Sequence, residues 1–317
     1  MVTPSKKEIF CGLALMDSPD FLAASLPLFD AGEVEVLEWS FDIGWENGQD
    51  EWASELVAFY SSENRLLGHG VNFSVLSGKW TAGQQAWIER FREECAQHSF
   101  MHVSEHFGFS RAGNVIQTSP LPVPYSKSAL ALGVERLKMM SSIAKVPIGL
   151  ENLGFAFSID CVKEQADFIN QLLDKSDGFL LLDLHNAFCQ IANFGVDAEE
   201  YFSLYPLQRV REIHISGGSW SADRDGNSIR RDTHDHEVPE EVFDLLMQVL
   251  WRCPNLKTVI LERLGNTIRS EEEAARFRSD FLHLKKLIQV FCSESYTEVI
   301  PPVSTLRTNG PKKAAKG

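Results

Sequence analysis

The sequence predicts a (β/α)8 barrel, also called a TIM barrel, in which eight parallel strands are surrounded by helices. The chain has 317 residues, and a barrel of this kind often takes about 250 residues or more as one domain. Short apolar or β-branched runs alternate with longer helical patterns from end to end, which indicates repeated βα units. Ionisable side chains gather where the predicted strands end, and a barrel would bring these ends together at one mouth.

The predicted strands are short apolar runs. They cover residues 9–15, 34–40, 65–71, 100–106, 146–152, 178–185, 210–216 and 258–263. Between them, apolar residues recur at spacings of three and four, which is typical of helices. The clearest helical segments are 51–62, 82–98, 126–144, 160–175, 239–252 and 270–291. A doubly wound open sheet is the competing architecture, but no glycine-rich nucleotide loop follows the first strand.

We expect residues 1–300 to form a single barrel domain. Residues 301–317 contain Pro, Gly and Lys without apolar periodicity, so we expect a disordered basic tail there. The first residues do not have the pattern of a secretory signal, and no stretch approaches the ~20 consecutive apolar residues of a membrane helix. These observations predict a cytoplasmic protein that does not interact with a membrane.

Charge and cysteine usage exclude other classes of protein. The net charge of -14 argues against nucleic-acid binding, which relies on cationic surface to neutralise phosphates. The six cysteines include no CxxC pair, which argues against a zinc ribbon, a thioredoxin-type motif and a disulfide framework. Carboxylates, by contrast, are in excess, and they are good ligands for hard cations.

Most histidines lie at or just beyond the end of a predicted strand. Six of the nine do so: His69, His106, His185, His214, His234 and His236. In a barrel these positions converge, so residues distant in sequence become neighbours. The other three, His98, His102 and His283, lie in helical patterns or inside a strand, and we assign them to packing or to the surface.

Carboxylates follow the same rule. Those at or near strand ends are Glu38, Glu105, Glu151, Asp183, Asp232 and Glu262. A buried carboxylate needs a partner, and for any single one a helix cap or an arginine is the simpler explanation. Six at one mouth, together with the histidines, predict a metal site instead.

Imidazole and carboxylate ligands together suit first-row ions such as iron, manganese or zinc. The potential ligands exceed what one ion can use, so more than one metal is implied. Residues two apart in a strand-like segment point the same way, so Asp183 with His185, and Asp232 with His234, could each present two ligands to one face. A nucleophilic dyad of Cys189 and His185 is a weaker alternative. Segment 219–232 is expected to be a mobile loop over the mouth.

A set of motifs in order along the chain resembles the multinuclear non-haem iron-dependent oxidative enzymes, which include those of methanobactin and 3-thiaglutamate synthesis. The motifs are HGV at 69–71, SEHFGFS at 104–110, LENLG at 150–154, LLLDLHNAFCQIANFGVD at 180–197, EIHISGG at 212–218, DTHDHEVPEEVFDLL at 232–246 and the strand-end Glu262. The match runs from about residue 9 to residue 290, and the combination is more specific than any one motif.

The resemblance implies a xylose-isomerase-like barrel with two or three irons, in mixed Fe(II) and Fe(III) states, at its mouth. The implied metal ligands are His69, His106, Glu151, Asp183, His185, His214, Asp232, His234 and Glu262. Many members have Asn in place of His185, which leaves open whether a third iron is bound and how it is coordinated. The predicted catalytic residues are Asn186, which members share, and Asp235 and His236, which would orient ligands or move protons.

By the same resemblance, the activity is an O2-dependent oxidation of a side chain, most often cysteine, in a ribosomally made precursor peptide. A separate partner protein usually recognises the leader of that peptide. The alternative is a divalent-metal isomerase or phosphodiesterase of the xylose-isomerase and endonuclease IV-like superfamily, which needs similar ligands but no redox change. A third hypothesis is a non-enzymatic scaffold that binds metal or peptide.

Overall fold

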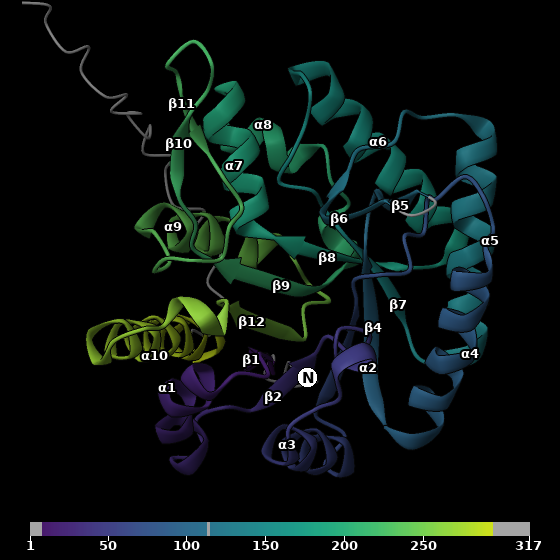
Figure 1. Ribbon diagram of the computed structural model, residues 1–317. Coiled ribbons are helices and arrows are strands. Elements are labelled where there is room, and N and C mark those ends of the chain that lie inside the picture. Colours follow the sequence, from purple (N-terminus) through teal and green to yellow (C-terminus); the bar gives the residue numbers. More distant parts are fainter. Residues whose placement is uncertain (1–7, 113–114, 294–317) are drawn as a thin grey trace, which may run out of the picture.

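The computed structural model describes residues 8–112 and 115–293, which form a closed barrel of parallel strands (Figure 1). Around the ring the strands are β1 (Phe10–Leu15), β12 (Thr258–Glu262), β9 (Val210–Ser216), β8 (Phe179–Asp183), β7 (Ile148–Glu151), β4 (Phe100–His106), β3 (Leu66–Gly70) and β2 (Val36–Trp39). β1 pairs in parallel with both β12 and β2, and this closes the ring. The predicted (β/α)8 barrel is confirmed.

The helices lie outside the ring of strands (Figure 1). They are α1 (Pro19–Asp30), α2 (Gly44–Asn47), α3 (Glu51–Ser62), α4 (Ala82–Gln97), α5 (Lys127–Ala144), α6 (Ile159–Ser176), α7 (Leu184–Phe194), α8 (Ala198–Ser203), α9 (Glu240–Val249) and α10 (Glu271–Ser293). Several begin at a hydroxyl side chain that accepts a backbone N–H of the first turn, as Ser126 does for α5 and Ser158 does for α6. These local caps agree with the predicted helix boundaries.

The interior of the barrel is layered. A small apolar cluster fills one layer and consists of Ala14, Val36, Leu67 and Ile260. Because alternate residues of a strand share a face, the residues two positions further on point into the barrel as well. For three of these strands that next layer is polar and consists of Glu38, His69 and Glu262. These apolar residues therefore form part of the floor beneath ionisable side chains at the carboxyl ends of the strands.

One predicted boundary is wrong. Residues 178–185 are predicted as a strand, but β8 ends at Asp183 and α7 begins at Leu184. The reason is that the Asp183 carboxylate accepts the backbone N–H of Asn186 at 2.6 Å and so starts the helix. His185 therefore lies in the first turn of a helix and not on the face of a strand.

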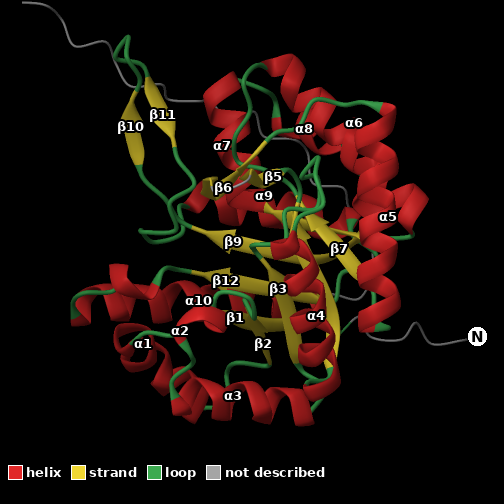
Figure 2. Cartoon of the chain, turned by 45° about the vertical axis from the view of Figure 1, so that its right-hand side comes forward, coloured by secondary structure: helices red, strands yellow, loops and turns green. Residues whose placement is uncertain are grey.

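Two antiparallel hairpins extend from the mouth of the barrel: β5 (Phe109–Ala112) with β6 (Val115–Leu121), and β10 (Trp220–Ala222) with β11 (Ser228–Arg230). The second occupies the segment predicted as a loop, and it stands beside α7 (Figure 2). The predicted tail at 301–317 lies outside the described residues. Among the described helices, none has the length and apolar character that crossing a membrane requires.

Candidate metal centre

The register of neighbouring strands places ionisable side chains side by side. His106 of β4 is the partner of Glu151 of β7, and Asp183 of β8 is the partner of His214 of β9. All four positions lie at the carboxyl ends of their strands, and all four side chains are largely buried. Parallel pairing thus brings together residues that are far apart along the chain.

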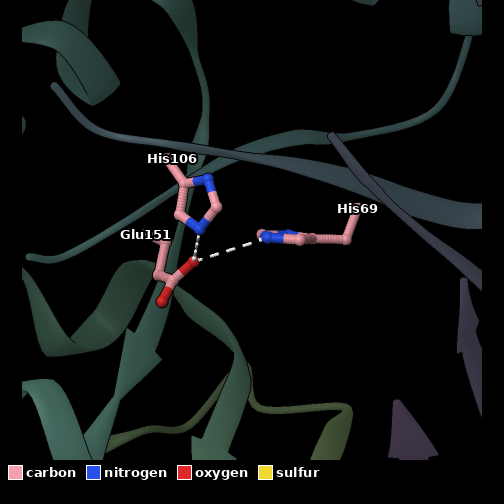
Figure 3. A group of neighbouring side chains, drawn as sticks. All are labelled: His69, His106 and Glu151. Carbon is pink, nitrogen blue, oxygen red and sulfur yellow. Dashed lines mark ion pairs between the residues drawn. The ribbon is translucent and has the colours of Figure 1, made fainter. Parts of the chain in front are cut away.

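The first group of ligating atoms consists of His69, His106 and Glu151 (Figure 3). The Oε2 atom of Glu151 lies 3.3 Å from Nε2 of His106 and 3.6 Å from Nε2 of His69. The Nδ1 atom of His69 lies 2.8 Å from the hydroxyl of Ser104, which itself donates to the carbonyl of Gly68. The hydroxyl therefore accepts from Nδ1–H, which leaves the lone pair of Nε2 directed at the group.

The second group surrounds Glu262. Its Oε2 atom lies 3.2 Å from Nδ1 of His214 and 3.8 Å from Nδ1 of His234. The other ring nitrogen of His214 lies 2.9 Å from Oε2 of Glu38. Asp183 also has a carboxylate oxygen within the reach of His234 and Glu262. Two imidazoles and three carboxylates thus converge on this part of the barrel mouth.

Within the described residues, four sets of three side chains have ligating atoms within 4.8 Å of one another. The sets are His69, His106, Glu151; Glu38, His214, Glu262; Glu151, Asp183, His214; and Asp183, His234, Glu262. Because Glu151, Asp183, His214 and Glu262 each belong to two sets, the sets form one continuous cluster of ligands. We call these eight residues the mouth cluster; a cluster of this extent can hold more than one ion.

Burial raises the pKa of three of the four carboxylates in the mouth cluster. It raises the pKa of Glu38 to about 7 and the pKa of Asp183 to about 7. Burial, and then the nearby Asp183, raise the pKa of Glu151 well above its usual range. For Glu262, burial is outweighed by His214 and His234, which lower its pKa to about 2. Without a metal, the cluster therefore holds a mixture of charged and protonated groups.

The imidazoles divide in the same way. Burial lowers the pKa of His69 well below its usual value and lowers that of His106 to about 4, so both rings are neutral and ready to ligate. Burial acts in the same direction on His214 and His234, but carboxylates outweigh it and raise the pKa of both well above the usual value. Each of these two rings holds a proton that a metal would displace.

Unpartnered buried atoms test whether a metal fits. Buried polar atoms are nearly always hydrogen-bonded. Here Oδ2 of Asp183, Nδ1 of His214, Nε2 of His234 and Oε2 of Glu262 are buried without a hydrogen bond, although several lie close to an opposite charge. Nitrogen and oxygen donors of this kind suit a first-row transition metal. The residues present therefore fit such an ion.

Two of the predicted ligands lie beside the mouth cluster and outside the four sets. Asp232 has its Oδ1 atom 2.7 Å from Nε2 of His234 and 3.2 Å from Nδ1 of His185. The other nitrogen of His185, Nε2, accepts a hydrogen bond of 3.1 Å from Nε of Arg230. Because the guanidinium can only donate, His185 has both nitrogens engaged, and neither is directed at the cluster.

The predicted catalytic residues separate into two places. Asn186 is buried and donates to Oε1 of Glu151 at 3.1 Å, while its backbone N–H binds Asp183, so it positions two members of the mouth cluster. Asp235 and His236 instead pair with each other at 2.7 Å, and the His236 side chain is 61% exposed. The structure does not bring this pair into the cluster.

The structure also bears on three other residues that were considered from the sequence. Glu38 is a member of the mouth cluster, although the motifs do not include it among the ligands; its place at a strand end is the signal that finds it. His102, assigned above to packing or to the surface, is fully buried inside the barrel, 3.0 Å from Glu212. Burial raises the pKa of Cys189 well above its usual value, which argues against its use as a nucleophile.

The fold is shared with several proteins of known structure. A xylose isomerase-like TIM barrel protein from Mycobacterium smegmatis, in complex with magnesium, aligns over 92% of this chain and 100% of its own, with a TM-score of 0.55 and 11% identity. Endonuclease IV from Thermus thermophilus aligns over 87% and 99%, with a TM-score of 0.53 and 16% identity. At these identities the likeness concerns the fold alone.

Relatives with detectable sequence identity point to one family. A UPF0276 protein from Paraburkholderia phytofirmans is 31% identical over 194 residues, which is 61% of this chain and 62% of that protein, so the chain spans less than two thirds of that relative. A UPF0276 protein from Caulobacter vibrioides is 28% identical over 227 residues, 71% of this chain and 76% of its own. RiPPs are ribosomally synthesised and post-translationally modified peptides. The sequence profile described as "RiPP precursor modification enzyme MbnB/TglH/ChrH" matches residues 38–277, so the chain belongs to this family, as its motifs predicted.

Proposed function

We propose that this protein is an iron- and O2-dependent enzyme that oxidises a side chain, such as that of cysteine, in a ribosomally made precursor peptide. The observation that carries the proposal is the mouth cluster, whose overlapping sets of imidazoles and carboxylates suit two adjacent first-row ions. Membership of a family of peptide-modifying enzymes supplies the class of substrate. With both nitrogens of His185 engaged by Arg230 and Asp232, we propose two irons and not three.

Iron in this cluster would supply an exchangeable electron and open positions for O2 and a substrate heteroatom. The protein's own residues prepare the ligands. Ser104 fixes the tautomer of His69, and Asn186 holds the carboxylates of Glu151 and Asp183 in place. Beneath the cluster, the apolar layer and the fully buried His102–Glu212 pair fill the barrel, so the closed interior would keep water from reaching the cluster from below.

Exposed aromatic side chains beside the cluster support a peptide substrate. Phe155 is 46% exposed and Phe157 is 68% exposed, and they lie in the loop that follows β7, with their ring centroids 5.0 Å apart. The preceding Gly154 lies against Asp232, where a Cβ atom would be 3.2 Å from that of the aspartate. Apolar surface at this place suits the side chains of a peptide. Recognition of a leader by a separate partner protein is part of the proposal.

The test is production of the protein in iron-replete, anaerobic conditions, followed by metal analysis and by reaction with candidate precursor peptides, which are to be sought among short reading frames near its gene. We expect about two irons per chain, consumption of O2, and a mass change in the peptide. The Asp183→Asn variant should give none of these at the wild-type level, whereas Glu94→Gln, which changes a largely buried carboxylate of α4 that accepts a hydrogen bond from Trp45 and belongs to none of the four sets, should give all of them. Turnover with zinc or magnesium in the absence of O2 would overturn the proposal and indicate a non-redox reaction.

A further inference from the structure

We propose that Arg230, at the end of the β10–β11 hairpin, binds a carboxylate of the peptide substrate beside the metal centre. This inference rests on the proposed function for the identity of the substrate as a peptide. Neither the motifs nor the predicted site residues include Arg230. Its surroundings nevertheless have the features of a constructed anion-binding position.

The backbone of Arg230 is fixed from the neighbouring helix. The side-chain amide of Asn193, on α7, accepts the N–H of Arg230 at 2.7 Å and donates to its carbonyl at 2.9 Å. This paired bond joins the hairpin to α7 and positions the side chain that follows from it. The position of Arg230 is therefore determined by the fold and not by a free surface loop.

The guanidinium is buried but incompletely paired. Arg230 is 5% exposed, and its Nε atom donates to His185. Its Nη2 atom is buried without a hydrogen bond, and among the described residues no carboxylate lies within ion-pair distance of it. Asp232, Asp235 and Glu241 act on it only at longer range. A buried cation with an open donor is costly, so a ligand that completes its pairing would be stabilised strongly.

Two aromatic rings cover the guanidinium. Its central carbon lies 5.4 Å from the ring centroid of Phe188 and 5.5 Å from that of Trp220. Phe188 belongs to α7, whereas Trp220 is at the start of the hairpin and is 53% exposed. Of the two rings, the indole of Trp220 is the one exposed to solvent, so a ligand would approach the guanidinium past this ring.

Short contacts connect Arg230 to the mouth cluster. They run from Nε of Arg230 to His185 at 3.1 Å, from His185 to Asp232 at 3.2 Å, and from Asp232 to His234 at 2.7 Å. A peptide whose carboxylate is bound at Arg230 would therefore present an adjacent residue to the metals. A guanidinium is planar and matches a carboxylate with two parallel N–H donors. In a peptide, the carboxylate can be an acidic side chain or the C-terminus.

Binding of three short probes to the full, metal-loaded chain tests the inference without O2, so its outcome is independent of any oxidation. The probes are N-acetyl-asparaginyl-cysteine with a free C-terminus, its C-terminal amide, and N-acetyl-aspartyl-cysteine amide. All three carry the same thiol, so any shared affinity for metal cancels. We expect one of the two carboxylate probes to bind about tenfold or more tightly than the neutral amide, and which one does so identifies the source of the carboxylate.

The variants assign this preference to one side chain. Arg230→Gln should remove it, and Arg230→Lys, which keeps the charge but not the planar fork, should reduce it with the fold intact. Arg231→Gln is the matched control, because it changes the exposed arginine next to it. Binding of a carboxylate probe should also alter the fluorescence of the wild type but not that of Trp220→Phe. Equal affinity for charged and neutral probes, or the same preference in Arg230→Gln as in Arg231→Gln, would overturn the inference.

Discussion

His106 and Glu151 occupy partner positions at the ends of two adjacent parallel strands, and Nε2 of the histidine lies 3.3 Å from Oε2 of the glutamate. Burial and the neighbouring Asp183 raise the pKa of Glu151, which makes its ionised form dependent on a bound cation. We therefore predict that Glu151→Gln lowers metal affinity by about 100-fold or more while the folded metal-free protein is retained. Metal analysis of the purified variant measures this. Wild-type metal content in Glu151→Gln would contradict it.

Metal binding should strengthen as pH rises. Burial raises the pKa of Glu38 and of Asp183 to about 7, and carboxylates raise the pKa of His214 and His234, so these groups hold protons in the metal-free protein near neutral pH. Only the deprotonated groups ligate, so affinity should increase between about pH 6 and pH 8, with release of protons. Calorimetry in buffers that differ in ionisation heat measures both effects. An affinity that is constant or falls over this range would contradict the prediction.

Asn186→Ala should weaken metal binding although Asn186 is not itself in any of the four sets of ligands. Its amide holds Glu151 at 3.1 Å and also donates to the carbonyl of Asn152 at 2.9 Å, so its loss frees the glutamate to rotate. Loss of such a positioning contact typically costs about 10- to 100-fold in metal affinity. Asn170→Ala, which removes an amide that donates to Leu204, is the control and should keep wild-type affinity. Equal affinities for the two variants would show that Asn186 has no positioning role.

Glu212 and His102 form a fully buried pair inside the barrel, 3.0 Å apart, and Arg211 donates to the other nitrogen of the imidazole. Removal of one partner leaves an uncompensated buried group, so Glu212→Leu should lower the free energy of unfolding by about 3 kcal/mol or more. Replacement of both partners by leucine should recover much of this loss, because neither a buried imidazole nor a buried carboxylate is then left unpaired, and the partly exposed Arg211 can donate to water instead. Urea unfolding of the single and double variants measures the difference. A double variant less stable than the single one would contradict this account.

The barrel and the convergence of its strand ends could be predicted because both follow from local patterns. Apolar runs mark the strands, and a polar residue directly after each run marks a strand end. A spacing of two residues is a weaker guide to which side chains share a face. Asp183 and His185 do not share a strand face, because the aspartate caps a helix. Asp232 and His234 do meet, but through an irregular segment in which His234 has a φ of 50°, and no strand spacing describes that conformation.

The level at which a strand residue lies along the barrel axis could not be predicted from the sequence. His102 and His106 are four residues apart on one strand and share its inner face, yet one pairs with Glu212 in the interior and the other belongs to the mouth cluster. Periodicity defines a face, whereas the stagger of neighbouring strands determines which residues lie at one level. Arg230 was missed for a related reason, since its importance depends on contacts with α7 that no local pattern encodes.

The closed ring has a consequence for biosynthesis of the protein. The members of the mouth cluster come from strands β2, β3, β4, β7, β8, β9 and β12 and from the segment that contains His234, and the ring is completed only when β12 pairs with β1. During translation, a nascent chain that has not yet released Glu262 lacks a ligand shared by two of the four sets. On the proposed function, acquisition of the full metal complement would therefore be a late event, because it requires that the last strand has been inserted.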